Sequence, residues 1–182
     1  MVGVSGSGKS SLATALAVAL DVPRVELDAL FWLPGWVERP GDEFTALVSE
    51  AVAADRWVVD GNYSRVAQPL VWARADTVVW LDLPRRTVMR QIVLRTLRRV
   101  ITRTELWDAA GNRERWQNFF SRDPQKSIIA WAWTRYPLTR QRYAAAMTDP
   151  ARAQLNFIRV TSRAAARRLV AQAAASTGRP AP

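Results

Sequence analysis

Residues 3–10 read GVSGSGKS, and this short stretch decides the fold that the rest of the chain must support. It matches the pattern G-x-x-x-x-G-K-[ST] in full. Glycines at these places let the backbone wrap closely around an anion and turn successive N–H groups toward it. Residues 10–20 are rich in Ala and Leu and predict a helix whose N-terminus faces the same anion. The stretch therefore predicts a phosphate-binding loop, with a chance match as the alternative.

The two polar residues that end this loop have separate tasks in such a site. The Lys9 ammonium group would reach the β- and γ-phosphates of a nucleotide, and the Ser10 hydroxyl would ligate Mg²⁺. ATP and Mg²⁺ are therefore the predicted cofactors. The residues predicted to bind ATP are Gly3, Ser5, Gly6, Ser7, Gly8, Lys9, Ser10 and Ser11.

The composition narrows the chemistry that the chain can perform. Its 182 residues include no Cys and no His. This removes disulfides, thiolate nucleophiles, imidazole bases and the usual zinc ligands. A metal ion would have to be hard and bound through oxygen, which again favours Mg²⁺. The chemistry must use Asp, Glu, Lys, Arg, Ser, Thr or Tyr.

The net charge of +10 favours an anionic partner, which could be a nucleotide, a nucleic acid or an acidic membrane surface. A codon bias toward Arg on solvated helix faces explains this charge equally well. No apolar run approaches the ~20 residues that a membrane span needs. We therefore expect a cytoplasmic protein without a membrane partner, either a monomer or a dimer.

Short apolar segments alternate with helical patterns along the chain. Continuous apolar strands such as TVVWLDL at 77–83 are typical of buried parallel sheets. Such alternation predicts an α/β fold with right-handed crossovers, in a single domain over residues 1–182. Residues 102–140 carry no strand signal and predict a helical lid inserted in this domain, and residues 33–41 predict a loop. The predicted strands are 22–27, 56–60, 77–83 and 155–160, and the predicted helices are 10–20, 42–54, 84–101, 124–133, 140–147 and one capped by Ser162.

Carboxylates stand at three predicted strand ends, namely at Asp28, Asp60 and Asp82. Ligands of open α/β sheets bind beyond the carboxyl ends of the strands. With no His available, an Asp is the natural acceptor for a substrate proton, or a ligand of Mg²⁺ through water. An Asp is also an ordinary turn residue at a strand end. Three together beside a phosphate loop favour function, and Asp28 and Asp60 most.

The order of these segments resembles that of the adenylate-kinase-like P-loop kinases. The phosphate loop is followed by ELDALFWLPGW (26–36), WVVDGNYSR (57–65) and DTVVWLDLP (76–84). Within that family the chain looks most similar to the FlaR-type topology-modulation branch. The resemblance implies a three-layer P-loop NTPase sandwich with a five-stranded parallel sheet of order 2-3-1-4-5 and a helical lid. It also implies transfer of the ATP γ-phosphoryl group to a small acceptor.

The resemblance further implies roles for single residues. Asp60 opens the segment DGNYSR, which stands in the place of the family's DGFPR motif. There the Asp helps to hold Mg²⁺, and the Arg, here Arg65, grips the acceptor phosphate. Gln68 lies at the spacing of a base-reading Gln. The segment departs from the family because Asn-Tyr-Ser replaces Phe-Pro. A carboxylate in the place of Asp28 is similar to shikimate- and gluconate-kinase relatives, in which it meets a substrate hydroxyl.

Arginines are the groups that would stabilise charge on a transferred phosphoryl group. Arg95, Arg99 and Arg103 recur on one face of the helix that begins at residue 84. By the resemblance, Arg95 is a lid arginine, and a well-placed Arg contributes about 10³- to 10⁵-fold in rate. A solvated basic face is the alternative for each. Trp32 and its aromatic neighbours lie beside the predicted acceptor pocket, where they would stack on a base or line an apolar wall.

These expectations combine into a kinase that moves the γ-phosphoryl group of Mg·ATP to a nucleoside monophosphate or a hydroxylated metabolite. Two alternatives remain: a nucleic-acid-associated ATPase, suggested by the charge, and a regulatory nucleotide-binding protein with weak catalysis. The expected catalytic residues are Lys9, Asp28, Asp60, Arg95 and Arg99; the expected substrate-binding residues are Asp28, Trp32, Arg65 and Gln68; and the expected metal ligands are Ser10 and Asp60.

The start of the sequence is unusual for this fold. Only Met1 and Val2 precede Gly3. The strand before the loop is central in such proteins and normally contributes several apolar residues. We therefore expect a truncated first strand, and a natural start codon that lies upstream, in a stretch encoding several β-branched residues.

Overall fold

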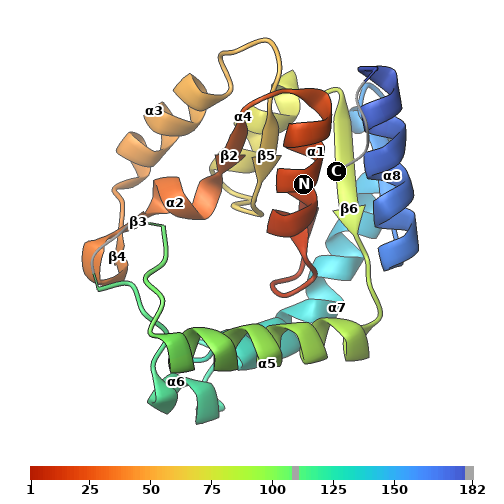
Figure 1. The fold of residues 1–182 in the computed structure, drawn as a ribbon. Coiled ribbons are helices and arrows are strands. Elements are labelled where there is room, and N and C mark those ends of the chain that lie inside the picture. The colour runs from red at the N-terminus through yellow and green to blue at the C-terminus, as the bar shows by residue number, and fades with distance from the viewer. Residues whose placement is uncertain (108–110, 179–182) are drawn as a thin grey trace.

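The structure is a computed structural model that describes residues 1–107 and 111–178. It is a mixed α/β fold with helices packed around parallel strands, as the sequence predicts (Figure 1). The strands are β1 (Val2–Gly3), β2 (Arg24–Glu26), β3 (Trp32–Leu33), β4 (Val37–Glu38), β5 (Val58–Asp60), β6 (Thr77–Leu81) and β7 (Asn156–Val160). The helices are α1 (Lys9–Leu20), α2 (Leu27–Phe31), α3 (Gly41–Ala51), α4 (Ala67–Arg74), α5 (Arg85–Thr102), α6 (Trp116–Phe120), α7 (Ile128–Met147) and α8 (Arg163–Ser176).

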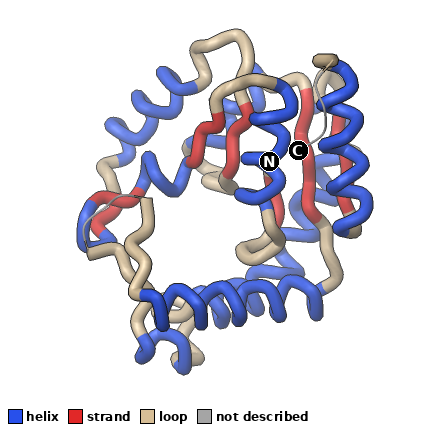
Figure 2. Tube along the Cα trace, in the orientation of Figure 1, coloured by secondary structure: helices blue, strands red, loops and turns tan. Residues whose placement is uncertain are grey.

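The strands form three separate sheets in the described parts of the chain (Figure 2). One sheet has the order β1-β6-β7, and all its strands are parallel. A second sheet pairs β2 with β5 in parallel, so that Glu26 lies opposite Asp60. The third is an antiparallel pair of β3 and β4. This small hairpin occupies the segment that the sequence predicts as a loop.

The prediction of one five-stranded sheet is therefore wrong. The break falls between β1 and β5, and its physical reason is that β1 contains only Val2 and Gly3. Two backbone hydrogen bonds cross the break: the Met1 amine donates to the Val59 carbonyl at 2.7 Å, and Gly61 N–H donates to the Met1 carbonyl at 3.4 Å. These bonds bring the two parallel sheets side by side without a regular ladder.

Helices cover both faces of the parallel strands because β6 is apolar on both sides. Val78 and Trp80 face one core cluster, which α3, α4 and α7 complete. Val79 and Leu81 alternate to the other face, where α1 and α8 pack. Burying each large apolar side chain contributes about 1.5–3 kcal/mol, so this strand anchors both layers. The continuous apolar pattern of 77–83 is explained by burial on both faces.

Helix α7 differs from the sequence prediction of two shorter helices. It begins at Ile128, where the Ser127 hydroxyl accepts from the Ala130 N–H, and it continues through Pro137. A proline inside a helix leaves the carbonyl four residues earlier without its partner. Here that carbonyl belongs to Trp133, and it accepts a hydrogen bond from the Arg85 guanidinium at 3.0 Å. A side chain from α5 therefore lets the helix pass through the proline.

The predicted lid, residues 102–140, is only partly helical in its described residues. Its helical parts are the short α6 and the first half of α7. An isolated antiparallel bridge joins Glu105 to Arg113 ahead of α6. Helix α5 leads into this region and lies across the end of the molecule below the phosphate loop (Figure 1). No helix in the described ranges is both long and apolar enough to cross a membrane.

Candidate active site

The predicted phosphate loop, residues 3–10, connects β1 to α1 through two glycines with left-handed backbone angles. The φ angle is 84° at Gly6 and 94° at Gly8, and helix α1 begins directly after Gly8. The loop is closed by a hydrogen bond from Ser7 N–H to the Val4 carbonyl at 3.1 Å. The Ser7 hydroxyl is buried and has no hydrogen-bond partner among the described residues. This loop therefore has the backbone curvature and the free polar groups that an anion site requires.

Lys9 lies at the centre of the charged groups around this loop. Its ammonium group folds back and donates to the Val4 carbonyl at 3.1 Å. Burial lowers the pKa of Lys9, the negative charges of Asp60 and Asp28 oppose that shift, and the charge of Arg95 adds to it. A half-buried ammonium group whose pKa responds to two carboxylates and a guanidinium marks the place where the predicted site residues come together.

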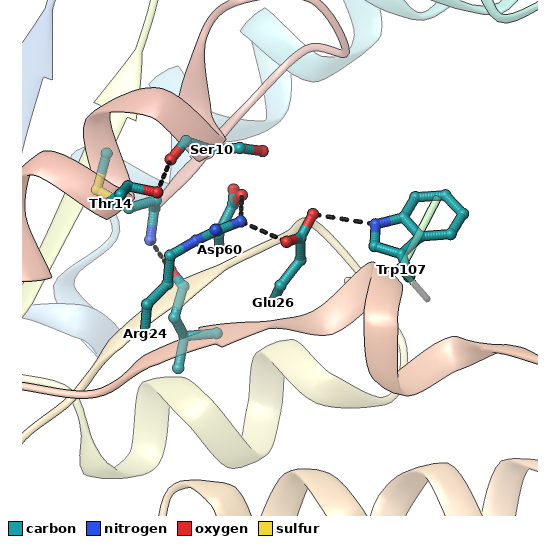
Figure 3. Close-up of polar contacts among 8 residues, drawn as sticks. Ser10, Thr14, Arg24, Glu26, Asp60 and Trp107 are labelled. Atoms are coloured by element: carbon teal, nitrogen blue, oxygen red, sulfur yellow. Dashed lines mark hydrogen bonds and ion pairs between the residues drawn. The ribbon is translucent and has the colours of Figure 1, made fainter. Parts of the chain in front are cut away.

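Asp60 ends strand β5 and is almost fully buried. Within the described parts of the chain its Oδ1 atom has no hydrogen-bond partner, and its Oδ2 atom lies 3.6 Å from the Arg24 guanidinium. Figure 3 draws this carboxylate beside the Arg24 guanidinium. An unpartnered carboxylate oxygen fits a hard cation such as Mg²⁺. The described residues contain no cluster of three acidic ligands, so phosphate and water oxygens would have to complete the coordination.

Asp28 lies on α2 and is held by a residue that the sequence did not single out. The Tyr63 hydroxyl donates a hydrogen bond to Asp28 Oδ1 at 2.7 Å. Burial raises the pKa of Asp28, and the Tyr63 hydrogen bond and the charge of Lys9 counteract part of that rise. Burial, followed by the charge of Asp28, also raises the pKa of Tyr63 far above its ordinary value. Tyr63 therefore stays protonated and acts only as a donor to this carboxylate.

The segment that contains Tyr63 also fixes the entrance of the phosphate loop. The Asn62 amide accepts from Gly3 N–H at 3.2 Å and donates to the Gly3 carbonyl at 2.7 Å. The Tyr143 hydroxyl of α7 donates to the same Asn62 oxygen at 3.1 Å. The Asn-Tyr-Ser segment at 62–64 thus ties three parts of the fold together at the site.

Two of the three predicted arginines lie near the charged centre. Burial is the main cause that lowers the pKa of Arg95 to about 10, and Arg99 adds to the shift. Burial also lowers the pKa of Arg99, whose guanidinium lies 4.0 Å from the Glu114 carboxylate. Arg103 is exposed and ends α5 with a left-handed φ of 49°. Arg95 and Arg99 are therefore the cations that α5 contributes to this region.

The other predicted residues lie in different surroundings. Arg65 is exposed, and its side chain makes no hydrogen bond or ion pair within the described parts of the chain. Gln68 faces a cavity of about 20 Å³, where its Oε1 atom is buried and has no partner. The Asp82 carboxylate pairs with Arg159 and, at 3.0 Å, with Arg140, so it joins β6 to β7 and α7. Both partners of the Asp82 carboxylate are therefore arginines of the protein itself.

Part of the lid lies against the hairpin and β2 through contacts that we call the lid latch, formed by Trp107 and Asn112 with their partners. The Trp107 indole donates to Glu26 Oε1 at 3.0 Å, and its ring packs against Trp36 at 5.6 Å. The fully buried Asn112 amide accepts from Trp36 N–H at 2.5 Å and donates to the Leu33 carbonyl at 3.0 Å. Sequence reasoning missed Asn112 because no local pattern distinguishes it.

A series of packed aromatic rings connects the lid latch to the core. Trp32 packs edge-on against Trp36 at 5.5 Å and against Phe31 at 5.0 Å, and Phe31 contacts the buried Phe44 at 5.2 Å. Such edge-to-face pairs contribute about 0.5–1.5 kcal/mol each beyond their burial. Trp32 therefore uses its ring within a ladder of protein side chains.

Comparison with known proteins does not assign the chain to a family. No protein-family model matches the chain, and a search of curated proteins gives no match.

Proposed function

We propose that this chain is a P-loop kinase that transfers the γ-phosphoryl group of Mg·ATP to a small acceptor. The observation that carries the proposal is the position of Lys9, which is half-buried at the head of α1 and whose pKa responds to the charges of Asp60, Asp28 and Arg95. A glycine loop at a helix N-terminus accounts for phosphate binding, and the flanking groups of both charges account for transfer. The finer fold assignment, a P-loop NTPase core with a helical lid, is part of this proposal.

Different residues in and around the loop would bind different parts of Mg·ATP. Lys9 would exchange its hydrogen bond with the Val4 carbonyl for the β- and γ-phosphate oxygens. The Ser7 hydroxyl, which has no partner in the structure, would donate to the same phosphates. Ser10 and the free Oδ1 of Asp60 would orient the magnesium ion, directly or through water. Bound Mg·ATP supplies the electrophilic phosphorus and the ADP leaving group.

Asp28 would act on the acceptor. Of the two Asp28 carboxylate oxygens, only Oδ1 has a hydrogen-bond partner among the described residues. The Oδ2 atom is therefore free to accept a proton from an acceptor hydroxyl. The acceptor oxygen then bonds to the γ-phosphorus, the bond from that phosphorus to the β–γ bridging oxygen breaks, and the proton passes to Asp28. The raised pKa of Asp28 makes it a better base than an exposed carboxylate. Arg95 and Arg99 would neutralise charge on the transferred group.

The acceptor side of the site favours a hydroxylated metabolite over a nucleoside monophosphate. The Asp28 carboxylate would repel an acceptor phosphate, and Arg65 is exposed without a contact that directs it toward Asp28. The Tyr63 hydroxyl is already used by Asp28. An uncharged hydroxyl group satisfies these surroundings with a hydrogen bond to the free carboxylate oxygen.

The test is ATP turnover by the purified protein across a panel of sugars, polyols and nucleoside monophosphates, with products identified by mass spectrometry. We expect one class of acceptor to raise turnover. Arg95→Ala should lower the transfer rate about 10³-fold, and Lys9→Ala should abolish nucleotide binding. Arg98→Ala, which removes an exposed arginine from the same helix, is the matched control and should leave the rate unchanged. Wild-type turnover that no acceptor raises would contradict the kinase proposal and favour an ATPase or a regulatory protein.

A further inference from the structure

A continuous line of side chains connects the lid latch to Asp60 (Figure 3). The Trp107 indole donates to Oε1 of Glu26, and Oε2 of the same carboxylate pairs with Nη2 of Arg24 at 2.5 Å. This Nη2 atom also lies 3.6 Å from Oδ2 of Asp60. The four residues come from the lid, from β2 and from β5, whose register places Glu26 directly opposite Asp60.

Glu26 and Asp60 therefore compete for one guanidinium nitrogen. The contact with Glu26 has hydrogen-bond length, whereas the contact with Asp60 is about an ångström longer and is not a hydrogen bond. The Arg24 Nε atom is buried and has no partner in residues 1–107 and 111–178, so nothing described there holds this nitrogen in position. A small rotation of the Arg24 side chain would exchange one carboxylate for the other.

We propose that Glu26 is a positioning residue that keeps Arg24 from occupying the metal-facing carboxylate of Asp60, and that the lid latch holds Glu26 in this role. The inference rests on the proposed function, because it assigns Asp60 to Mg²⁺. An arginine paired directly with Asp60 would place a positive charge where the cation must bind. The Glu26 carboxylate offsets that charge and draws the guanidinium away.

The lid latch makes the pairing of Glu26 with Arg24 depend on the position of the lid. Trp107 donates to one oxygen of Glu26 and leaves the other oxygen directed at Arg24. Trp107 and its partner Trp36 both have left-handed φ angles, 58° and 62°, which are unfavourable for bulky residues. The docked position therefore persists only through its contacts, and their loss would release Glu26. An undocked lid would then let Arg24 close on Asp60 and weaken metal binding.

The experiment measures binding of a fluorescent ATP analogue to the full chain as a function of Mg²⁺ concentration, and again in excess chelator. Glu26→Gln keeps the shape of the side chain and removes its charge. We expect it to raise the Mg²⁺ concentration at half-maximal binding roughly tenfold, within the range typical of coupled sites. Metal-free binding should be unchanged. Trp107→Phe, which removes only the indole donor and part of the ring, should shift the midpoint in the same direction by a smaller factor.

Two further variants separate this reading from a general loss of structure. Arg24→Gln added to Glu26→Gln removes the competing cation and should restore the wild-type Mg²⁺ midpoint. Glu43→Gln, which removes one partner of the exposed pair with Arg39, is the matched control and should have no effect. Equal Mg²⁺ midpoints for Glu26→Gln and wild type, or a defect that Arg24→Gln does not reverse, would overturn the inference alone. A wild-type chain that binds no nucleotide at all would instead overturn the proposed function.

Discussion

The packing of the phosphate loop against α5 makes a prediction that needs no ligand. A Cβ atom added at Gly6 would lie 2.6 Å from Ile92 Cβ, whereas one added at Gly8 would meet no atom within 4 Å. Both glycines have left-handed φ angles, so both alanine variants carry the same backbone penalty of about 1–2 kcal/mol. The reduced entropy of the unfolded chain offsets about 0.4–1 kcal/mol of it in each. Only Gly6→Ala adds crowding against α5, which costs about 1–3 kcal/mol more.

We therefore expect Gly8→Ala to lower the free energy of unfolding by about 1 kcal/mol, and Gly6→Ala by about 2–4 kcal/mol. The assay is urea unfolding without nucleotide, followed by the far-ultraviolet circular dichroism of the helices. The slope of the unfolding transition should be the same in both variants, because neither changes the surface exposed on unfolding. Equal destabilisation by the two substitutions would refute the contact between the loop and α5.

Two other predictions concern Asp28 and the lid latch. Burial raises the pKa of Asp28 above its unfolded value, so its contribution to stability falls as pH rises through the folded pKa. Asp28→Asn should thus be more stable than wild type at neutral pH, and equally stable at a pH below the ordinary carboxyl pKa. Urea unfolding at the two pH values measures both, and a stability difference that does not depend on pH would contradict this prediction. Asn112→Ala removes two buried hydrogen bonds, and trypsin should cleave after Arg113 and Arg115 about tenfold faster, whereas Asn118→Ala should match wild type.

Local patterns were enough to predict most elements of the fold. The phosphate loop, the helix after it and the apolar strand 77–83 follow from glycine placement and from runs of apolar residues. The continuation of α7 through Pro137 could not be predicted, because it depends on Arg85, which is supplied by another helix. The split between the two parallel sheets depends on how few residues of β1 pair with a neighbour.

The candidate site shows the same division. Lys9 was predicted from a motif, Asp28 and Asp60 from strand ends, and Arg95 from a helix face and the family resemblance. The charges of the other three all affect the pKa of Lys9. The residues that support them were not predicted. Tyr63 meets Asp28 across 35 positions and Trp107 meets Glu26 across 81 positions. Contacts of this kind follow from the folded arrangement and leave no periodicity in the sequence.

The aromatic ladder that joins the core to the lid has an optical consequence. The indoles of Trp32, Trp36 and Trp107 are held with ring centres 5.5 and 5.6 Å apart and at steep angles to one another. Chromophores fixed so closely in an asymmetric array couple their strong transitions, which adds a pair of bands of opposite sign to the circular dichroism. The third indole belongs to the lid and the other two to the hairpin region. The circular dichroism of the native chain therefore reports whether the lid is docked, without any attached label.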